Sequence, residues 1–281
     1  MPPSSAASQP LEPEELAQAV AKLAQCLKQS RAQYSISGGA ASMVVCMQHG
    51  LEDVRSTEDI DLVVQPAGDI TAESISTWLL QNYPNDFVAK ITYGVSIPSL
   101  AFRRSNGSIT YIEIEMFESM FGLKDLNNEV VMIDVSGVQV PVFSARWLLR
   151  EKIITAFERR GSKKERTDVE DACNLLEAVK SDSVDLTNRE DAVRHLLAKR
   201  PDIRQSLEVK VICPAVLGRP WAWNEYAEIY WRFEKDELRC VDENIQPHKC
   251  EWNEAARVWY FTAGGRSWFY SAECNDLRLS T

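Results

Sequence analysis

Helical and strand-like patterns of apolar residues alternate along the first two thirds of the chain. Apolar residues recur every three or four positions after Pro13, and a proline followed by two glutamates is typical of a helix start. Residues 34–37 then have the pattern of a short strand, residues 40–48 that of a helix ending at Gly50, and residues 70–82 that of another helix. These segments predict strands and helices that follow one another along the chain.

A β-hairpin is predicted around Asn106-Gly107, because Asn-Gly between two apolar runs is the strongest short-range hairpin signal. Its strands are residues 100–103 and 109–117. In the second strand apolar residues occupy alternate positions, and the positions between them include Glu113 and Glu115. Two carboxylates are therefore expected on one face of this strand.

A second hairpin, with strands over residues 130–135 and 138–143, is predicted around a Ser-Gly turn. Ser144 follows it as a suitable N-cap for a helix over residues 145–160. A basic loop over residues 161–166 is expected to separate this helix from the next one, which carries two aspartates and two leucines. The middle of the chain is therefore predicted to be helical.

Tryptophans crowd the last quarter of the chain, where short runs alternate apolar and polar residues. This pattern predicts a small antiparallel sheet with the tryptophans in its core, and no internal repeat is visible. The whole chain reads as an α+β fold: a mixed, mostly antiparallel sheet flanked by helices, a helical middle segment and a small β-rich C-terminal part. The expected division is a disordered tail at residues 1–10, a core domain at 11–143, a helical segment at 144–200 and an aromatic-rich β extension at 201–281.

The chain has 281 residues, a formal net charge of -10 and a pI near 5.0. Its field repels polyanions, so tight non-specific binding to long nucleic acids is disfavoured. Seven scattered cysteines lack the density of a secreted disulfide scaffold, and the sequence has neither a signal peptide pattern nor an apolar run long enough to span a bilayer. A cytoplasmic protein without membrane association is expected, and a nuclear location stays open.

Asp59 and Asp61 are the first candidates for chemistry. They lie one residue apart in an otherwise apolar, strand-like run, so their side chains share one face of the strand. Carboxylates in such a position need a compensating cation or hydrogen-bond donor, and their hard oxygen ligands suit Mg²⁺ or Mn²⁺. Alternatively, the two aspartates cap a turn or pair with Arg55 at the surface.

Two further features complete a candidate phosphate and metal site. Gly38-Gly39 lies between a strand and a helix, and free backbone amides at a helix start bind phosphate readily. Glu113 or Glu115 supplies a third carboxylate from a neighbouring strand. The alternative for these glutamates is the solvated face of an edge strand.

Together these motifs resemble the signature of the nucleotidyltransferase superfamily that includes the DNA polymerase β-like enzymes. The resemblance is carried by Ser37-Gly38-Gly39-Ala40-Ala41 and by Arg55-Ser56-Thr57-Glu58-Asp59-Ile60-Asp61-Leu62. Downstream, residues 140–152 and 167–171 are similar to the lysine helix and the aspartate helix of the bacterial abortive-infection toxin nucleotidyltransferases (AbiEii-like). The resemblance covers roughly residues 34–176 and leaves the aromatic C-terminal part outside.

The resemblance implies an enzyme that moves an NMP group from an NTP, such as ATP, to a hydroxyl of a small molecule, a protein or an RNA end. It implies Mg²⁺ or Mn²⁺ as cofactor, held by Asp59, Asp61 and a third carboxylate, for which Glu115 aligns better than Glu113. The residues that it places at the nucleotide are Ser37, Gly38, Gly39, Arg55, Ser56, Thr57 and Lys152.

The family usually carries an aspartate where this chain offers a glutamate. A second hypothesis is therefore a catalytically inactive module of the same fold, which senses a nucleotide or docks a protein partner through the C-terminal part. A third keeps the site but transfers a phosphoryl group. Asp168 and Asp171 are predicted to pair with Lys152 and to hold it in place. The C-terminal cysteines and histidine lack the spacing of paired-cysteine zinc sites.

Overall fold

The computed structural model describes residues 11–92, 95–118, 129–179 and 184–280. It divides into two compact units, Met1–Leu148 and Leu149–Thr281. The disordered tail predicted at residues 1–10 lies outside the described residues. In the part of the chain that is described, every helix is too short or too polar to cross a lipid bilayer.

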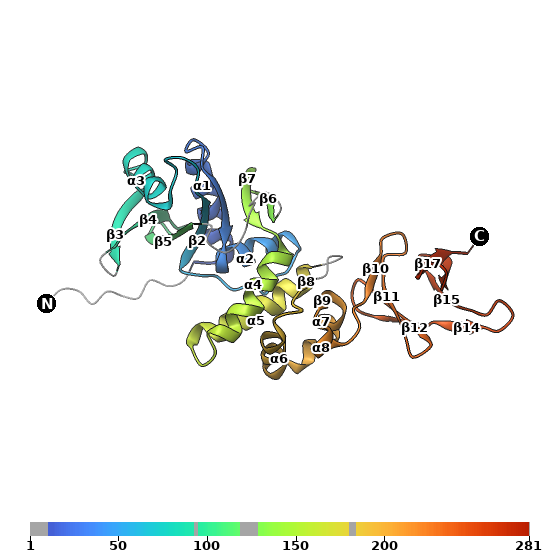
Figure 1. The fold of residues 1–281 in the computed structure, drawn as a ribbon. Coiled ribbons are helices and arrows are strands. Elements are labelled where there is room, and N and C mark those ends of the chain that lie inside the picture. Colours follow the sequence, from blue (N-terminus) through green and yellow to red (C-terminus); the bar gives the residue numbers. More distant parts are fainter. Residues whose placement is uncertain (1–10, 93–94, 119–128, 180–183, 281) are drawn as a thin grey trace. The chain divides into compact units, whose positions relative to one another are not determined.

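The first unit is built on a seven-stranded sheet with the strand order β3-β4-β5-β2-β1-β7-β6 (Figure 1). The neighbours β2–β5 and β1–β7 are parallel and the other neighbours are antiparallel, so the predicted mixed, mostly antiparallel sheet is confirmed. The elements of this unit are α1 (Pro13–Leu27), β1 (Gln33–Ser37), α2 (Gly38–Gln48), β2 (Asp59–Gln65), α3 (Ala72–Asn82), β3 (Phe87–Thr92), β4 (Val95–Arg103), β5 (Ile109–Glu118), β6 (Val130–Val135) and β7 (Val138–Phe143).

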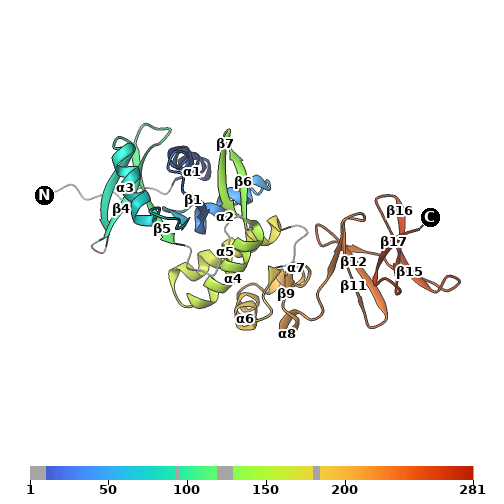
Figure 2. The same ribbon diagram turned by 45° about the horizontal axis from the view of Figure 1, so that its top comes forward.

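Strand β2 occupies the centre of the sheet and has two different faces. Ile60, Leu62 and Val64 on one face are fully buried, whereas Asp59 and Asp61 on the other are half-buried. Helix α1, seen end-on in Figure 2, contacts β4, β6 and β7, and α2 contacts β1 and β2. Burial of the apolar face on these elements fixes the register of β2, because a slip by one residue would turn both aspartates into the core.

Helix α4 (Ala145–Glu158) begins where the sequence predicts, and the Ser144 hydroxyl accepts a hydrogen bond from the Trp147 backbone N–H at 3.2 Å. The second unit continues with α5 (Lys163–Ala178), β8 (Val184–Asp185), α6 (Glu190–Lys199), the 3-10 helix η2 (Pro201–Ile203), α7 (Arg204–Lys210), β9 (Val211–Ile212) and α8 (Pro214–Leu217). A loop separates α4 from α5 as predicted, but the limits predicted for it, residues 161–166, are wrong because α5 already begins at Lys163. The Ser162 hydroxyl accepts from the Glu165 backbone N–H, and this N-cap starts α5 at Lys163.

The last part of the second unit consists of two four-stranded antiparallel sheets. Their strands are β10 (Ala222–Asn224), β11 (Ile229–Glu234), β12 (Glu237–Asp242) and β13 (Pro247–His248), then β14 (Glu251–Asn253), β15 (Val258–Ala263), β16 (Arg266–Ser271) and β17 (Asp276–Leu279). One buried cluster draws on both sheets and includes Trp231 and Trp268, as expected for core tryptophans, whereas Trp252 is exposed.

These two sheets are copies of one supersecondary unit, so the expectation that the chain has no internal repeat is wrong. Trp223-Asn224-Glu225 in the first copy recurs as Trp252-Asn253-Glu254 in the second. The first turn of each copy has one residue with positive φ, Glu228 (52°) or Arg257 (55°). The next turn has two, Lys235-Asp236 or Gly264-Gly265. The two copies share the backbone conformation of their turns but few side chains, so the sequence signals the repeat only weakly.

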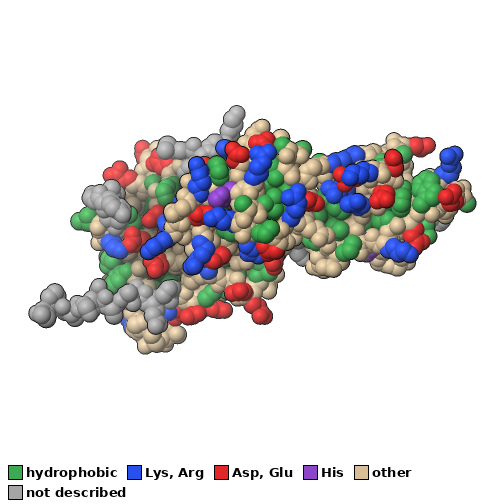
Figure 3. Space-filling model, turned by 90° about the horizontal axis from the view of Figure 1, so that it is seen from below, with side chains coloured by type: hydrophobic (Ala, Val, Ile, Leu, Met, Phe, Trp, Pro, Cys, Tyr) green, Lys and Arg blue, Asp and Glu red, His purple; other side chains and the backbone are tan. Residues whose placement is uncertain are grey.

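Figure 3 shows basic and acidic side chains interspersed on one face of the molecule.

In the second unit, the buried carboxylate of Glu165 has three hydrogen-bond or ion-pair partners. The Glu165 carboxylate accepts from the Gly161 backbone N–H at 2.6 Å, and it lies 2.5 Å from the Lys199 ammonium and 3.0 Å from Nε2 of His195. The Lys199 ammonium, followed by the Gly161 N–H, lowers the pKa of Glu165 from 4.5 to about 2.

Glu165 is expected to make the stability of the second unit depend on pH. Because its pKa is lower in the folded chain, its contribution is complete above pH 4.5 and is lost as the pH falls toward about 2. The free energy of unfolding of wild type and Glu165→Gln, measured by urea denaturation, should differ clearly near neutral pH and less near pH 3. A difference of the same size at both pH values would contradict this assignment.

Candidate active site

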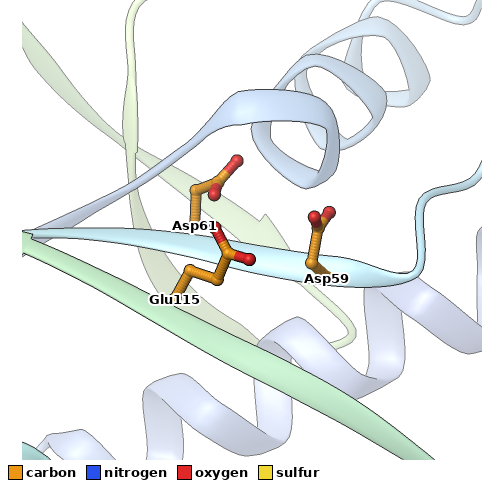
Figure 4. A group of neighbouring side chains, drawn as sticks. All are labelled: Asp59, Asp61 and Glu115. Atoms are coloured by element: carbon orange, nitrogen blue, oxygen red, sulfur yellow. The ribbon is translucent and has the colours of Figure 1, made fainter. Parts of the chain in front are cut away.

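Three carboxylates from two neighbouring strands converge on one point of the first unit. Strands β2 and β5 are parallel, and Asp61 lies opposite Glu115 in their register. Residues that are opposite each other in adjacent strands point to the same face of the sheet. One oxygen from each of Asp59, Asp61 and Glu115 therefore lies within 4.8 Å of the others (Figure 4).

Glu113, the other candidate for the third carboxylate, has a different environment. It lies opposite Asp59 in the register of β2 and β5, but its carboxylate forms an ion pair with Lys90 of β3. Glu115, in contrast, has no ion pair or hydrogen bond within the described part of the chain. The structure therefore brings Glu115, and not Glu113, together with the two aspartates. Sequence reasoning missed Lys90, whose only signal is its place in the alternating run of β3.

The first residue of α2 approaches Asp61 so closely that it must be glycine. Gly38 has a φ of +65°, and a Cβ atom built on it would lie 1.7 Å from Oδ2 of Asp61. A Cβ on Gly39 would lie 3.2 Å from Nη2 of Arg55 and from Cβ of Thr57. The glycine pair thus lets the start of α2 contact both the carboxylate group and the loop before β2.

Residues of this loop and of the α2 start are polar and lie next to the carboxylates. The Thr57 hydroxyl donates to Oδ1 of Asp59 at 2.5 Å, which orients that carboxylate. The hydroxyl of Ser56 is buried and has no hydrogen-bond partner among the described residues. Ser37 is the N-cap of α2, but its side chain does not cap the helix. The amides at the start of an α-helix attract anions, so this arrangement can hold phosphate groups.

Lys152 belongs to the second unit, where it is buried on α4. Its ammonium lies 2.9 Å from Asp168 and 2.7 Å from Asp171 of α5, and Asp168 also pairs with Arg159 at 3.0 Å. The predicted pairing of Lys152 with both aspartates is confirmed. Its role toward a nucleotide stays a prediction.

The donor set of the three carboxylates fits a hard divalent cation. All its atoms are carboxylate oxygens, the ligands that Mg²⁺ and Mn²⁺ prefer, and two of the three carboxylates come from one short stretch of β2. Among the described residues it is the only group of three or more histidine, cysteine, aspartate or glutamate ligands this close together. The ligand atoms of Cys240, His248 and Cys250 are not brought this close together.

A family model described as "Nucleotidyl transferase AbiEii toxin, Type IV TA system" matches residues 30–239. Among solved structures, an antigenic nucleotidyltransferase-like protein from Paracoccidioides brasiliensis is 33% identical, with a TM-score of 0.66. The match covers 75% of this chain and 100% of that one. None of the curated proteins compared matches the chain.

The antibiotic-resistance factor ANT(2'')-Ia is a more remote neighbour, with 11% identity over 69% of this chain and 95% of that one. Its TM-score is 0.39. The family match, in contrast, spans most of the chain and includes the glycine turn, β2 and β5. The chain therefore belongs to the AbiEii nucleotidyltransferase family.

Proposed function

We propose that the protein is a metal-dependent nucleotidyltransferase that moves an NMP group from an NTP to a hydroxyl acceptor. The observation that carries this proposal is the meeting of three carboxylates beside a helix start that only glycine allows to come so near. An acidic group can hold divalent ions, and the adjacent amides can hold the phosphates that such ions bridge. Either feature alone is common, and the combination supports phosphate chemistry.

In this proposal Asp59, Asp61 and Glu115 hold the metal. Bound Mg²⁺ or Mn²⁺ supplies positive charge to the phosphates and lowers the pKa of an attacking hydroxyl. Thr57 keeps the Asp59 carboxylate oriented through its hydrogen bond. Glu115, which has no described partner of its own, is placed to accept the proton of the acceptor hydroxyl.

The phosphates of the donor would lie against the start of α2. The amides that follow Ser37, together with the buried Ser56 hydroxyl and the Arg55 guanidinium beside Gly39, offer donors for phosphate oxygens.

The reaction balances without another reactant. The acceptor hydroxyl oxygen forms a bond to the α-phosphorus, and the bond from that phosphorus to the oxygen bridging to the β-phosphate breaks. Pyrophosphate leaves with the electron pair of the broken bond, and the hydroxyl proton passes to Glu115. The products are an NMP ester of the acceptor and pyrophosphate.

Metal-dependent binding of an NTP tests this proposal directly. Calorimetric titration with ATP, GTP, CTP and UTP should show binding of at least one of them that requires Mg²⁺ or Mn²⁺. Asp59→Ala should weaken that binding by about 10-fold or more, because one of three carboxylates is lost. Asp69→Ala, which removes an exposed aspartate just after β2, is the matched control and should bind as wild type does. Undiminished metal-dependent binding to Asp59→Ala would contradict the proposal.

A turnover assay distinguishes the proposed enzyme from the inactive, nucleotide-sensing alternative. It is motivated by the glutamate at the position where the family usually has an aspartate. Incubation with each labelled NTP and metal, scored for pyrophosphate, should show release that depends on an acceptor. Binding without any release, across a panel of hydroxyl acceptors, would favour the sensing module.

A further inference from the structure

Four carboxylates of the first unit lie on one face of the sheet, but only three of them come together. Asp59 of β2 is opposite Glu113 of β5, and two residues further along Asp61 is opposite Glu115, so all four side chains share a face. One oxygen from each of Asp59, Asp61 and Glu115 lies within 4.8 Å of the others. The Glu113 carboxylate instead pairs with the Lys90 ammonium of β3. The strand register alone does not separate Glu113 from the group, so the ion pair has to be considered.

The end of the β4–β5 ladder explains why Lys90 meets Glu113. Strand β4 lies between β3 and β5, and Lys90 of β3 is opposite Ile97 of β4. If the ladder of β4 and β5 continued, Ile97 would lie opposite Glu115, but the ladder already ends at Ser99 opposite Glu113. Ser99 is buried and its side chain is short, so the long lysine side chain can span β4 at this point. Lys90 therefore pairs with the last glutamate that is aligned with β4.

The pair of Lys90 and Glu113 matters more for charge than for stability. Its side chains are 55% and 24% exposed, and ion pairs with this exposure contribute little to stability. Without Lys90, however, a fourth carboxylate would carry its charge beside Asp59, and like charges at short distance repel each other. A divalent cation relieves such repulsion, and its affinity for a carboxylate site depends on the number of charged ligands. A freed Glu113 would therefore take part in binding the ion.

We propose that Lys90 is a positioning residue that decides which glutamate completes the metal group. By holding Glu113, it leaves Glu115 as the third carboxylate and limits the group to three negative charges. This inference rests on the proposed function, because it takes Asp59, Asp61 and Glu115 to hold the metal. Lys90 itself contacts neither the metal nor the nucleotide in this assignment, and it acts through Glu113.

Metal binding in the absence of a nucleotide tests the role of Lys90. Titration of the full chain with Mn²⁺, followed by the EPR signal of the free ion, measures the affinity. Lys90→Met removes the ammonium but keeps an unbranched side chain, so it should tighten Mn²⁺ binding by about three-fold or more. Lys90→Arg keeps the charge and should bind as wild type does. Equal affinities of Lys90→Met and wild type would overturn the proposal.

Lys22→Met is the matched control for Lys90→Met. It changes the net charge of the chain by the same amount, and it breaks another partly exposed ion pair of the first unit, that of Lys22 with Asp86. Since neither residue belongs to the group of three carboxylates, its Mn²⁺ affinity should equal that of wild type. Tighter binding in both variants would assign the effect to net charge and would count against a specific role of Lys90.

Combined substitutions test which glutamate binds the ion. In the wild-type background Glu115→Gln should weaken Mn²⁺ binding by about 10-fold, because one of three carboxylates is lost. In the Lys90→Met background the same substitution should weaken it by only about three-fold or less, because Glu113 can replace Glu115. Adding Glu113→Gln to that double variant should restore the full loss.

The same titrations separate failure of this inference from failure of the proposed function. If Glu115→Gln binds Mn²⁺ as tightly as its parent in both backgrounds, the carboxylate group does not hold the metal and the proposed function is refuted. If Glu115→Gln weakens binding by the same factor in both backgrounds, the metal group stands and only the role of Lys90 is refuted. Far-UV circular dichroism of each variant checks that the chain is folded.

Discussion

Glu115→Gln is expected to lower the rate of nucleotidyl transfer by about 100-fold or more, the scale found when one group that stabilises developing charge is removed from an active site. Glutamine keeps the size of the side chain but removes a charge from the group formed with Asp59 and Asp61. It also cannot accept the proton of the acceptor hydroxyl. The rate of pyrophosphate release under single-turnover conditions measures the effect.

Glu113→Gln is the matched control for that prediction. The two glutamates lie two residues apart on the same face of β5, but Glu113 is paired with Lys90. Its loss removes one partly exposed ion pair, so transfer should fall less than about 10-fold. A larger loss in Glu113→Gln than in Glu115→Gln would assign the third carboxylate to Glu113. Full activity in both variants would remove carboxylates of β5 from the mechanism.

Lys152→Ala is expected to destabilise the second unit by about 3–5 kcal/mol, because it leaves buried carboxylates without their main partner. Asp168 and Asp171 are 1% and 3% exposed, and Arg159 remains close only to Asp168. The free energy of opening of the α4 and α5 amides, measured by hydrogen exchange, reports this change locally. It does not require that the whole chain unfold in one step.

Lys22→Ala provides the comparison for Lys152→Ala. Lys22 also forms an ion pair, with Asp86 at 3.1 Å, but both side chains are partly exposed to solvent, at 42% and 34%. Exposed pairs contribute little, so this variant should change stability by less than about 1 kcal/mol. If Lys152→Ala were as mild as Lys22→Ala, the Lys152 pairs would not hold α4 to α5.

Elements whose signals are local in sequence could be predicted closely. The hairpin over residues 130–143 was predicted with the strand limits that the structure has, because a Ser-Gly turn and strand periodicity suffice. The same holds for the start of α1 at Pro13 and for the Ser144 cap of α4. A local error arose at residues 161–166, where charge suggested a loop but Ser162 caps a helix.

Features that depend on pairing between distant segments could not be predicted. The repeat of the two C-terminal sheets has one short signal in the sequence, the Trp-Asn-Glu match, and otherwise rests on the conformation of matching turns. The ladder of β4 and β5 ends at Ser99 and Glu113. The end of the β4–β5 pairing becomes visible only when the strands are placed side by side.

The amino-acid pattern alone placed Asp59 and Asp61 on one face of a strand and a glycine pair before a helix, because side-chain alternation and turn chemistry are properties of a few consecutive residues. The pattern did not decide whether Glu113 or Glu115 is the third carboxylate, because both lie on the same face of β5. The folded sheet distinguishes them. Parallel pairing of β2 with β5 places Glu115 beside Asp61, whereas Glu113 forms an ion pair with Lys90 of β3. Strand order and cross-strand ion pairs are long-range, so packing of the whole sheet was needed to settle them.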